Sequence, residues 1–159
     1  MKNICWLAII LLSGASVADD ADDASAKVYE YFEVFNAKDI PGIVNSIYST
    51  PVHVGGGSGH RVLADDAAAI ENLAGLYEML DGQGWKESVI ENVRTCLLSG
   101  TLALVDTRYS RIDHDDDPIP PAIRTNLYVV QKIDGEWRIV SFYGHDADRR
   151  PVCETSGSE

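Results

Sequence analysis

Residues 124–145 constrain the fold most, because they read as two strands joined by a tight turn. Two runs of aliphatic, aromatic and β-branched residues, the types that strands favour, flank the pair Asp134-Gly135. An Asp-Gly pair tolerates the positive φ values that a two-residue hairpin turn requires. The stretch therefore predicts an antiparallel β-hairpin that ends in a polar, aromatic tip at Tyr143 and His145.

Residues 1–18 are typical of a secretory signal peptide. One lysine precedes an unbroken apolar run over residues 4–12, and small residues ending at Ala18 come before two aspartates. The run is well short of the roughly 20 residues that a membrane-spanning helix needs. We expect cleavage after Ala18, export to the periplasm or out of the cell, and no membrane segment in the mature protein.

The remaining chain reads as one acidic domain. The whole sequence has 13 basic and 25 acidic residues, a formal net charge of −12, and 45% hydrophobic residues. An acidic surface repels phosphate backbones and anionic lipid heads, which argues against nucleic acid or a membrane as partner. We expect an acidic linker over residues 19–25, a single domain over residues 26–146 and a flexible tail over residues 147–159.

Two cysteines remain after cleavage, Cys96 in an apolar strand-like run and Cys153 in the tail. In an oxidising compartment they can form a disulfide. The alternative is a buried free thiol at Cys96 and an unpaired thiol in the tail, and the sequence leaves both open. Neither cysteine has the spacing of a metal site, and no cofactor motif is present, so we predict neither metal nor cofactor.

Helical and strand-like patterns occupy different parts of the chain. Helical spacing of apolar residues runs over residues 26–37, a short second helix follows a capping Asp39, and a third helix runs to Leu80. A short strand at residues 51–54 and a glycine-rich loop at residues 55–59 precede the third helix, and four strand-like runs follow it. This segregation predicts an α+β domain with its helices on one face of a curved antiparallel sheet.

These segments resemble the nuclear transport factor 2-like (NTF2-like) superfamily, in particular its SnoaL-like group of polyketide cyclases and ketosteroid isomerases. The resemblance rests on VYEYFEVFNAKDIPGIVNSIYS, HVGGGSGHRVLADDAAAIENL and YVVQKIDGEWRIVSFYGHD. It implies a cystatin-like cone, in which the sheet wraps around the first helix and leaves a pocket at the wide end. It also implies a homodimer formed through the open face of the sheet. Activities differ among proteins of this fold, so the fold alone does not assign one.

Strict strand alternation places Trp137, Ser141 and Tyr143 on one side of the last strand, with His145 beyond them. Aromatic walls with a few polar groups suit a small apolar or aromatic ligand. The residues predicted to line such a pocket are Tyr29, Tyr48, His53, Trp85, Arg124, Tyr143 and His145. Each also has a structural interpretation: the aromatic residues can complete the core, and Arg124 can pair with Asp106.

Two classes of function stay open. The chain can be an exported binding or assembly module, or a cofactor-independent isomerase, cyclase or dehydratase. In the second case His53, His145 or Asp106 would be the general base. A histidine or Asp106 that points into an enclosed cavity opposite a tyrosine hydroxyl would favour the enzyme, whereas a cavity filled by Phe32, Tyr48 and Trp85 would argue against it.

Overall fold

A computed structural model describes residues 17–57, 59–151 and 153. Residues 1–16 of the predicted signal peptide lie outside the described residues. In the part of the chain that the structure describes, no helix is long and apolar enough to cross a membrane.

The sheet has six strands in the order β2-β1-β6-β5-β4-β3. The strands are β1 (Tyr48–Gly56), β2 (Gly59–Leu63), β3 (Trp85–Ser99), β4 (Leu102–Asp113), β5 (Arg124–Ile133) and β6 (Glu136–Gly144). Strands β3 to β6 form the predicted antiparallel series, and Asp134 and Gly135 adopt positive φ values of 52° and 87° at the β5–β6 turn. Strand β1 pairs in parallel with β6, so the sheet is mixed rather than wholly antiparallel. No local pattern reports this pairing, because it joins residues far apart in the chain.

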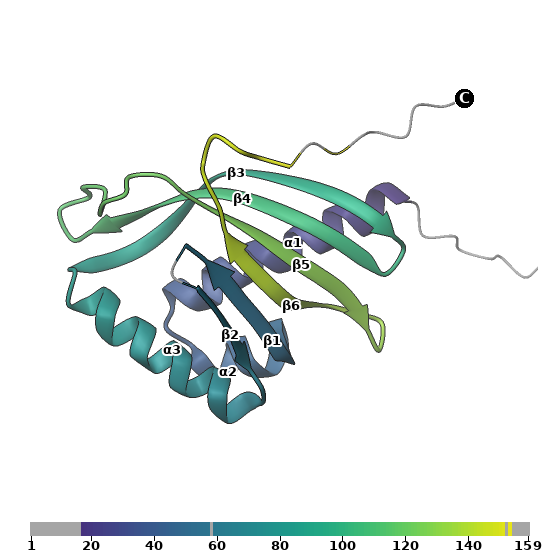
Figure 1. The fold of residues 1–159 in the computed structure, drawn as a ribbon, viewed down its shortest axis with the longest axis horizontal. Coiled ribbons are helices and arrows are strands. Elements are labelled where there is room, and N and C mark those ends of the chain that lie inside the picture. The colour runs from purple at the N-terminus through teal and green to yellow at the C-terminus, as the bar shows by residue number, and fades with distance from the viewer. Residues whose placement is uncertain (1–16, 58, 152, 154–159) are drawn as a thin grey trace, which may run out of the picture.

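The helices are α1 (Val17–Asn36), α2 (Ile40–Gly42) with the π-helical turn η1 (Ile43–Ile47), and α3 (Asp66–Asp81). Asp39 and Asp65 cap α2 and α3, each accepting a backbone N–H at 2.9 Å. Helix α1 lies along one face of the sheet, and α3 lies beside β1 and β2 (Figure 1). The candidate pocket lies in the space between α3 and the sheet.

The acidic segment at residues 19–25 is helical and not a linker. It forms the first turns of α1, where alanines favour a helix and aspartates interact well with the helix dipole. Asp20 also accepts from Lys132 of β5 at 2.6 Å, which ties this end of the helix to the sheet. The glycine-rich loop is likewise shorter than predicted, because Gly55, Gly56 and Gly59 belong to the β1–β2 hairpin.

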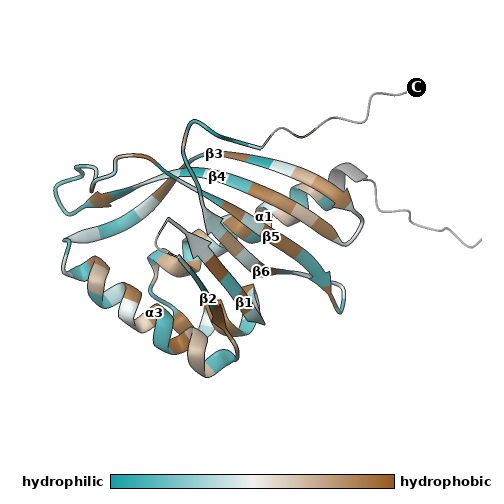
Figure 2. Ribbon diagram, in the orientation of Figure 1, coloured by the Kyte–Doolittle hydropathy of each residue, from teal (hydrophilic) through white to brown (hydrophobic). Residues whose placement is uncertain are grey.

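An aromatic core fills the space between α1 and the sheet. Phe35 packs against Tyr77 and Trp85 with ring centroids 4.9 and 5.4 Å apart, and Tyr31 stacks on Tyr48 at 5.9 Å. Figure 2 shows apolar residues interspersed with polar ones along the strands, as expected for a sheet with one face on a core. Burial raises the pKa of four core tyrosines, Tyr31, Tyr48, Tyr77 and Tyr128.

A β-bulge in β6 overturns the predicted alternation of that strand. Val130 pairs with Ile139, but Val129 pairs with Ser141, so β6 carries one extra residue at this point. An extra residue exchanges the two faces of the strand beyond it. As a result Phe142, and not Tyr143, lies on the inner side with the core.

Candidate functional site

A cavity opens between α3 and the inner face of the sheet at the wide end of the cone. Its outer chamber has a volume of about 640 Å³ and its inner chamber about 50 Å³. The two share Leu76 of α3, Tyr109 and Arg111 of β4, Asn126 of β5 and Phe142 of β6. We call the two chambers together the cone pocket. Its size lies within the range of small-molecule sites, roughly 300 to 1,000 Å³.

Most of the pocket wall is apolar. The outer chamber is lined by Val54 and Leu63 from the β1–β2 hairpin and by Leu76 and Met79 from α3. The inner chamber ends on aromatic rings of α1 and the sheet, namely Tyr31, Phe32, Phe35, Tyr128 and Phe142. Such walls can remove the apolar body of a ligand from water.

Arg111 gives the pocket one charged end. Its Nε–H is buried and has no hydrogen-bond partner among the described residues. An unsatisfied buried donor costs about 1–3 kcal/mol, and more when it is charged. The last inward positions of β4 thus present a guanidinium with unused hydrogen-bonding capacity to the cavity.

Two tyrosine hydroxyls lie beside this arginine. Asn126 Nδ2 donates to Tyr109 Oη and to Tyr128 Oη, both at 3.3 Å. Each phenol oxygen therefore accepts from the amide and keeps its own O–H for another acceptor. Burial raises the pKa of Tyr128 well above its ordinary value, so its hydroxyl stays a donor at neutral pH.

A polar cavity of about 410 Å³ adjoins the pocket and also contacts Tyr109, Arg111 and Asn126. Arg124 lines it, but its guanidinium already donates to the carbonyls of Ile119, Pro120 and Pro121. Burial, followed by the charge of Arg111, lowers the pKa of Arg124. The two arginines therefore lie close enough to repel each other. The prediction that Arg124 can pair with Asp106 was wrong, because its guanidinium binds these backbone carbonyls.

Three of the four aromatic residues predicted for the pocket wall, Trp85, Tyr48 and Tyr29, belong to the core or the surface and do not line the cone pocket. Trp85 and Tyr48 are 2% and 4% exposed and belong to the core. Trp85 packs on Phe35 and donates through Nε1 to Ser88 Oγ at 3.3 Å. Tyr29 is 46% exposed on α1. The predictions for these residues were wrong because a helix or strand pattern does not show how much of the cone the core fills.

His53 also lies away from the cone pocket. It neighbours His60 across the β1–β2 hairpin, with His53 Nδ1 3.3 Å from His60 Nε2. Its neighbour Val54 lines the pocket, and successive residues of a strand point to opposite faces. His53 therefore faces the outer side of the sheet.

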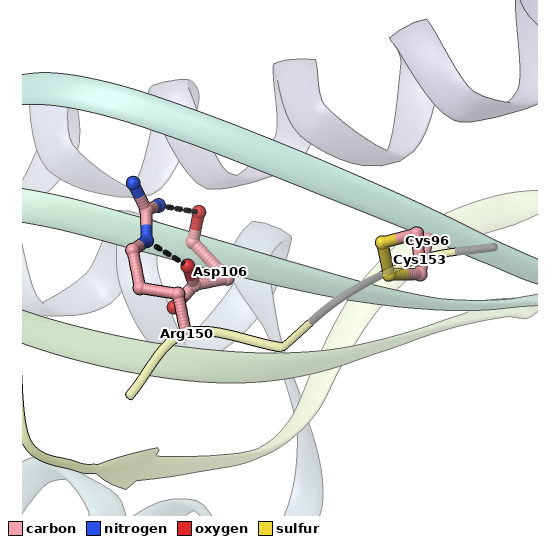
Figure 3. Close-up of a disulfide and its surroundings, with 4 residues drawn as sticks. All are labelled: Cys96, Asp106, Arg150 and Cys153. Atoms are coloured by element: carbon pink, nitrogen blue, oxygen red, sulfur yellow. Dashed lines mark hydrogen bonds and ion pairs between the residues drawn. A yellow bond between two sulfur atoms is a disulfide. The ribbon is translucent and has the colours of Figure 1, made fainter. Parts of the chain in front are cut away.

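Asp106 and His145 meet on the outer face of the sheet. Asp106 is 1% exposed, and His145 Nε2 lies 2.7 Å from its Oδ1. The guanidinium of Arg150 holds the other carboxylate oxygen (Figure 3). Asp106 cannot face the cone pocket, because Val105 and Thr107 on either side of it occupy the inner face. It is a structural carboxylate held between the His145 ring and the Arg150 guanidinium.

Part of the tail lies against the outer face of the sheet. Residues 145–151 and Cys153 cross the outer face of the sheet and form a strap, and Cys153 forms a disulfide with Cys96 of β3, with Cα atoms 5.4 Å apart (Figure 3). A cavity of about 390 Å³ lies under the strap and contacts Tyr143, His145 and Arg150. Tyr143 and His145 therefore line this outer cavity, and His145 also reaches the polar cavity.

The sequence prediction missed Arg111, Tyr109, Asn126 and Phe142. A partial signal for the first two was available. Alternation along β4 puts Val105, Thr107, Tyr109 and Arg111 on one face, but Leu102 and Leu104 make the start of the opposite face equally apolar, so the pattern did not tell which face is the inner one. Phe142 gave no such signal, since its face depends on the bulge in β6.

The long helix, the curved sheet and the pocket at the wide end define an NTF2-like domain. The chain belongs to the family of NTF2-like proteins designated DUF6841, whose model matches residues 21–147. The narrower SnoaL-like grouping stays a prediction. No curated protein sequence matches the chain.

Solved structures share this fold at low sequence identity. An NTF2-like protein with a cystatin-like fold from Novosphingobium aromaticivorans has a TM-score of 0.67 and 11% identity, over 83% of this chain and 84% of that one. An NTF-2 like protein of unknown function from Shewanella oneidensis has a TM-score of 0.61 and 18% identity, over 79% and 98%. A ketosteroid isomerase-like protein from Erwinia carotovora atroseptica has a TM-score of 0.61 and 16% identity, over 79% and 95%. At these identities the similarity concerns the fold alone.

Proposed function

We propose that this protein is exported and binds a small, mainly apolar organic molecule in the cone pocket. The observation that supports this most directly is a cavity of about 640 Å³ with apolar walls and a few converging polar groups. A preformed cavity of this kind is the usual form of a small-molecule site. The disulfide on the outer face agrees with an oxidising compartment.

The described residues that line the cone pocket favour binding over catalysis, because they include no positioned general base. Among the described residues that line it there is no histidine, cysteine or aspartate, and Glu71 at the exposed mouth is the one carboxylate. Asp106 lies on the opposite face of the sheet. His145 reaches the polar cavity, but its Nε2 is held by Asp106 and its Nδ1 lies 2.9 Å from the carbonyl oxygen of Asp146. A proton transfer in the pocket would therefore lack a positioned base.

The test is native mass spectrometry of the mature protein, together with binding of the neutral fluorescent probe N-phenyl-1-naphthylamine. Gly75 of α3 lines the pocket, and a Cβ built there meets no atom within 4 Å. Gly75→Phe should therefore fill the pocket without disturbing the helix, and it removes an unfavourable glycine from the helix interior. Ala74→Phe adds the same side chain to the neighbouring exposed position outside the pocket and serves as the control.

We expect the parent and Ala74→Phe proteins to retain a small molecule or to bind the probe, and Gly75→Phe to do neither. Probe binding that is unchanged by Gly75→Phe, or no binding by the parent, would refute the proposal. The same spectra count the chains per particle and so test the predicted homodimer. The strap already covers part of the sheet face through which that dimer was expected to form.

A further inference from the structure

We propose that the ligand of the cone pocket is an organic anion, an apolar body carrying one carboxylate-type charge that Arg111 binds. This inference rests on the proposed function and adds the chemical class of the ligand. Seven of the twelve described lysines and arginines have a carboxylate partner, namely Lys27, Lys38, Lys86, Arg108, Lys132, Arg149 and Arg150.

Arg111 differs from these residues in position and in contacts. Its side chain lines both chambers of the cone pocket and the adjoining polar cavity. No ion pair or side-chain hydrogen bond is formed by it within the described residues, and its Nε–H is buried. Its backbone is fixed, because its carbonyl accepts from Ile119 at 2.8 Å at the end of β4. A half-buried arginine in a rigid strand, with a buried Nε–H and its donors unused, is prepared for an anion.

Neighbouring groups add to the attraction for a negative charge. Arg124 lies close by and its cationic charge is not cancelled by a carboxylate, since its guanidinium binds carbonyl oxygens. Tyr109 has a hydroxyl hydrogen free to donate, because its oxygen accepts from Asn126. Cationic and hydroxyl donors therefore converge at this end of the pocket, and Glu71 is at the other end, on exposed α3.

The rest of the pocket limits what the anion can be. The other two arginines near the pocket already have partners: Arg61 at the mouth donates to Asn72 at 2.9 Å, and Arg124 donates to backbone carbonyls, so Arg111 alone of the three has its donors unused for an anion. The net charge of −12 repels multiply charged anions over a distance. A single carboxylate on an apolar or aromatic body fits both the charge and the wall.

The test compares two fluorescent probes with the same ring system. N-phenyl-1-naphthylamine is neutral, and 8-anilino-1-naphthalenesulfonate carries one sulfonate, which takes the place of the carboxylate. Arg111→Met keeps much of the apolar stem and removes the charge, and Arg111→Lys restores the charge. Arg94→Met, at an exposed position on β3, makes the same change of net charge away from the pocket.

We expect Arg111→Met to weaken binding of the sulfonate probe about 10- to 100-fold, the range for a lost charge-assisted hydrogen bond. Binding of the neutral probe should change less than about 3-fold, Arg111→Lys should recover part of the loss, and Arg94→Met should change neither. Decanoate should compete for the site better than decanol in the parent and lose that advantage in Arg111→Met.

Gly75→Phe can weaken the binding of both probes while Arg111→Met changes the affinity for the two probes equally. In that case the anion inference is wrong and the pocket proposal stands. If neither probe responds to Gly75→Phe, the pocket proposal itself fails. Circular dichroism of each variant shows whether it is folded. If Arg111→Met does not fold, the competition in the parent protein carries the test: decanoate that competes no better than decanol would overturn the anion inference.

Discussion

Removing the Cys96–Cys153 disulfide should lower the free energy of unfolding by about 4 kcal/mol. The two cysteines are 57 residues apart in the chain. In the chain-entropy description, a cross-link stabilises by about 3 kcal/mol for a 15-residue loop and about 4.7 kcal/mol for a 100-residue loop, because it restricts the unfolded chain. A loop of this length falls between the two values, nearer the larger.

The measurement is urea denaturation of the oxidised mature protein and of the double variant Cys96→Ser with Cys153→Ser. Replacing both cysteines avoids a free thiol that can cross-link two chains. With a urea dependence of about 2 kcal/mol per molar, the midpoint should fall by about 2 M. The parent after reduction should unfold at nearly the same midpoint as the double variant, which separates the loss of the bond from an effect of the serines.

An unchanged midpoint in the double variant would refute the reasoning. It would mean that the disulfide does not form in the mature protein, or that the unfolded chain is already as compact without it. A second measurement concerns function: because the strap and the cone pocket lie on opposite faces of the sheet, the variant should bind the neutral probe as the parent does.

Three further predictions concern stability. Asp106→Asn should cost about 2 to 3 kcal/mol in urea denaturation, because it leaves the nearly buried Arg150 without its anionic partner, and a cost below 0.5 kcal/mol would show that the pair contributes little. Gly55→Ala should cost about 1 to 3 kcal/mol, since its Cβ would lie 2.5 Å from the Tyr143 ring. The double variant with Tyr143→Ala should lose less stability than the two single variants lose together, and simple additivity of the two losses would contradict the contact. The four buried tyrosines have raised pKa values in the folded state, so the unfolded chain loses their protons first. Their contribution to stability should be constant below about pH 10 and fall as the pH rises above it, and absorbance of these tyrosinates should then appear together with unfolding, not before it.

Local patterns in the sequence were enough to predict the main helices and strands and the family of folds. The Asp134-Gly135 turn, the Asp39 cap and the succession of helices before strands are local signals, and the structure has the hairpin, the cap and the α+β arrangement that they predict. These features follow from residues close together in the chain, whose conformational preferences do not depend on distant contacts.

The tertiary structure decided which side chains reach the pocket. One extra residue in β6 exchanged Tyr143 for Phe142, the parallel pairing of β1 with β6 joined the β1–β2 hairpin to the antiparallel strands, and the strap brought Arg150 to Asp106. Each depends on strand register or on contact between distant segments, and a strand pattern carries neither. Arg111 depends on both local pattern and tertiary structure. Alternation along β4 places it on the same face as Tyr109, but the cavity that leaves its guanidinium without a partner exists only once α3 has packed beside the sheet.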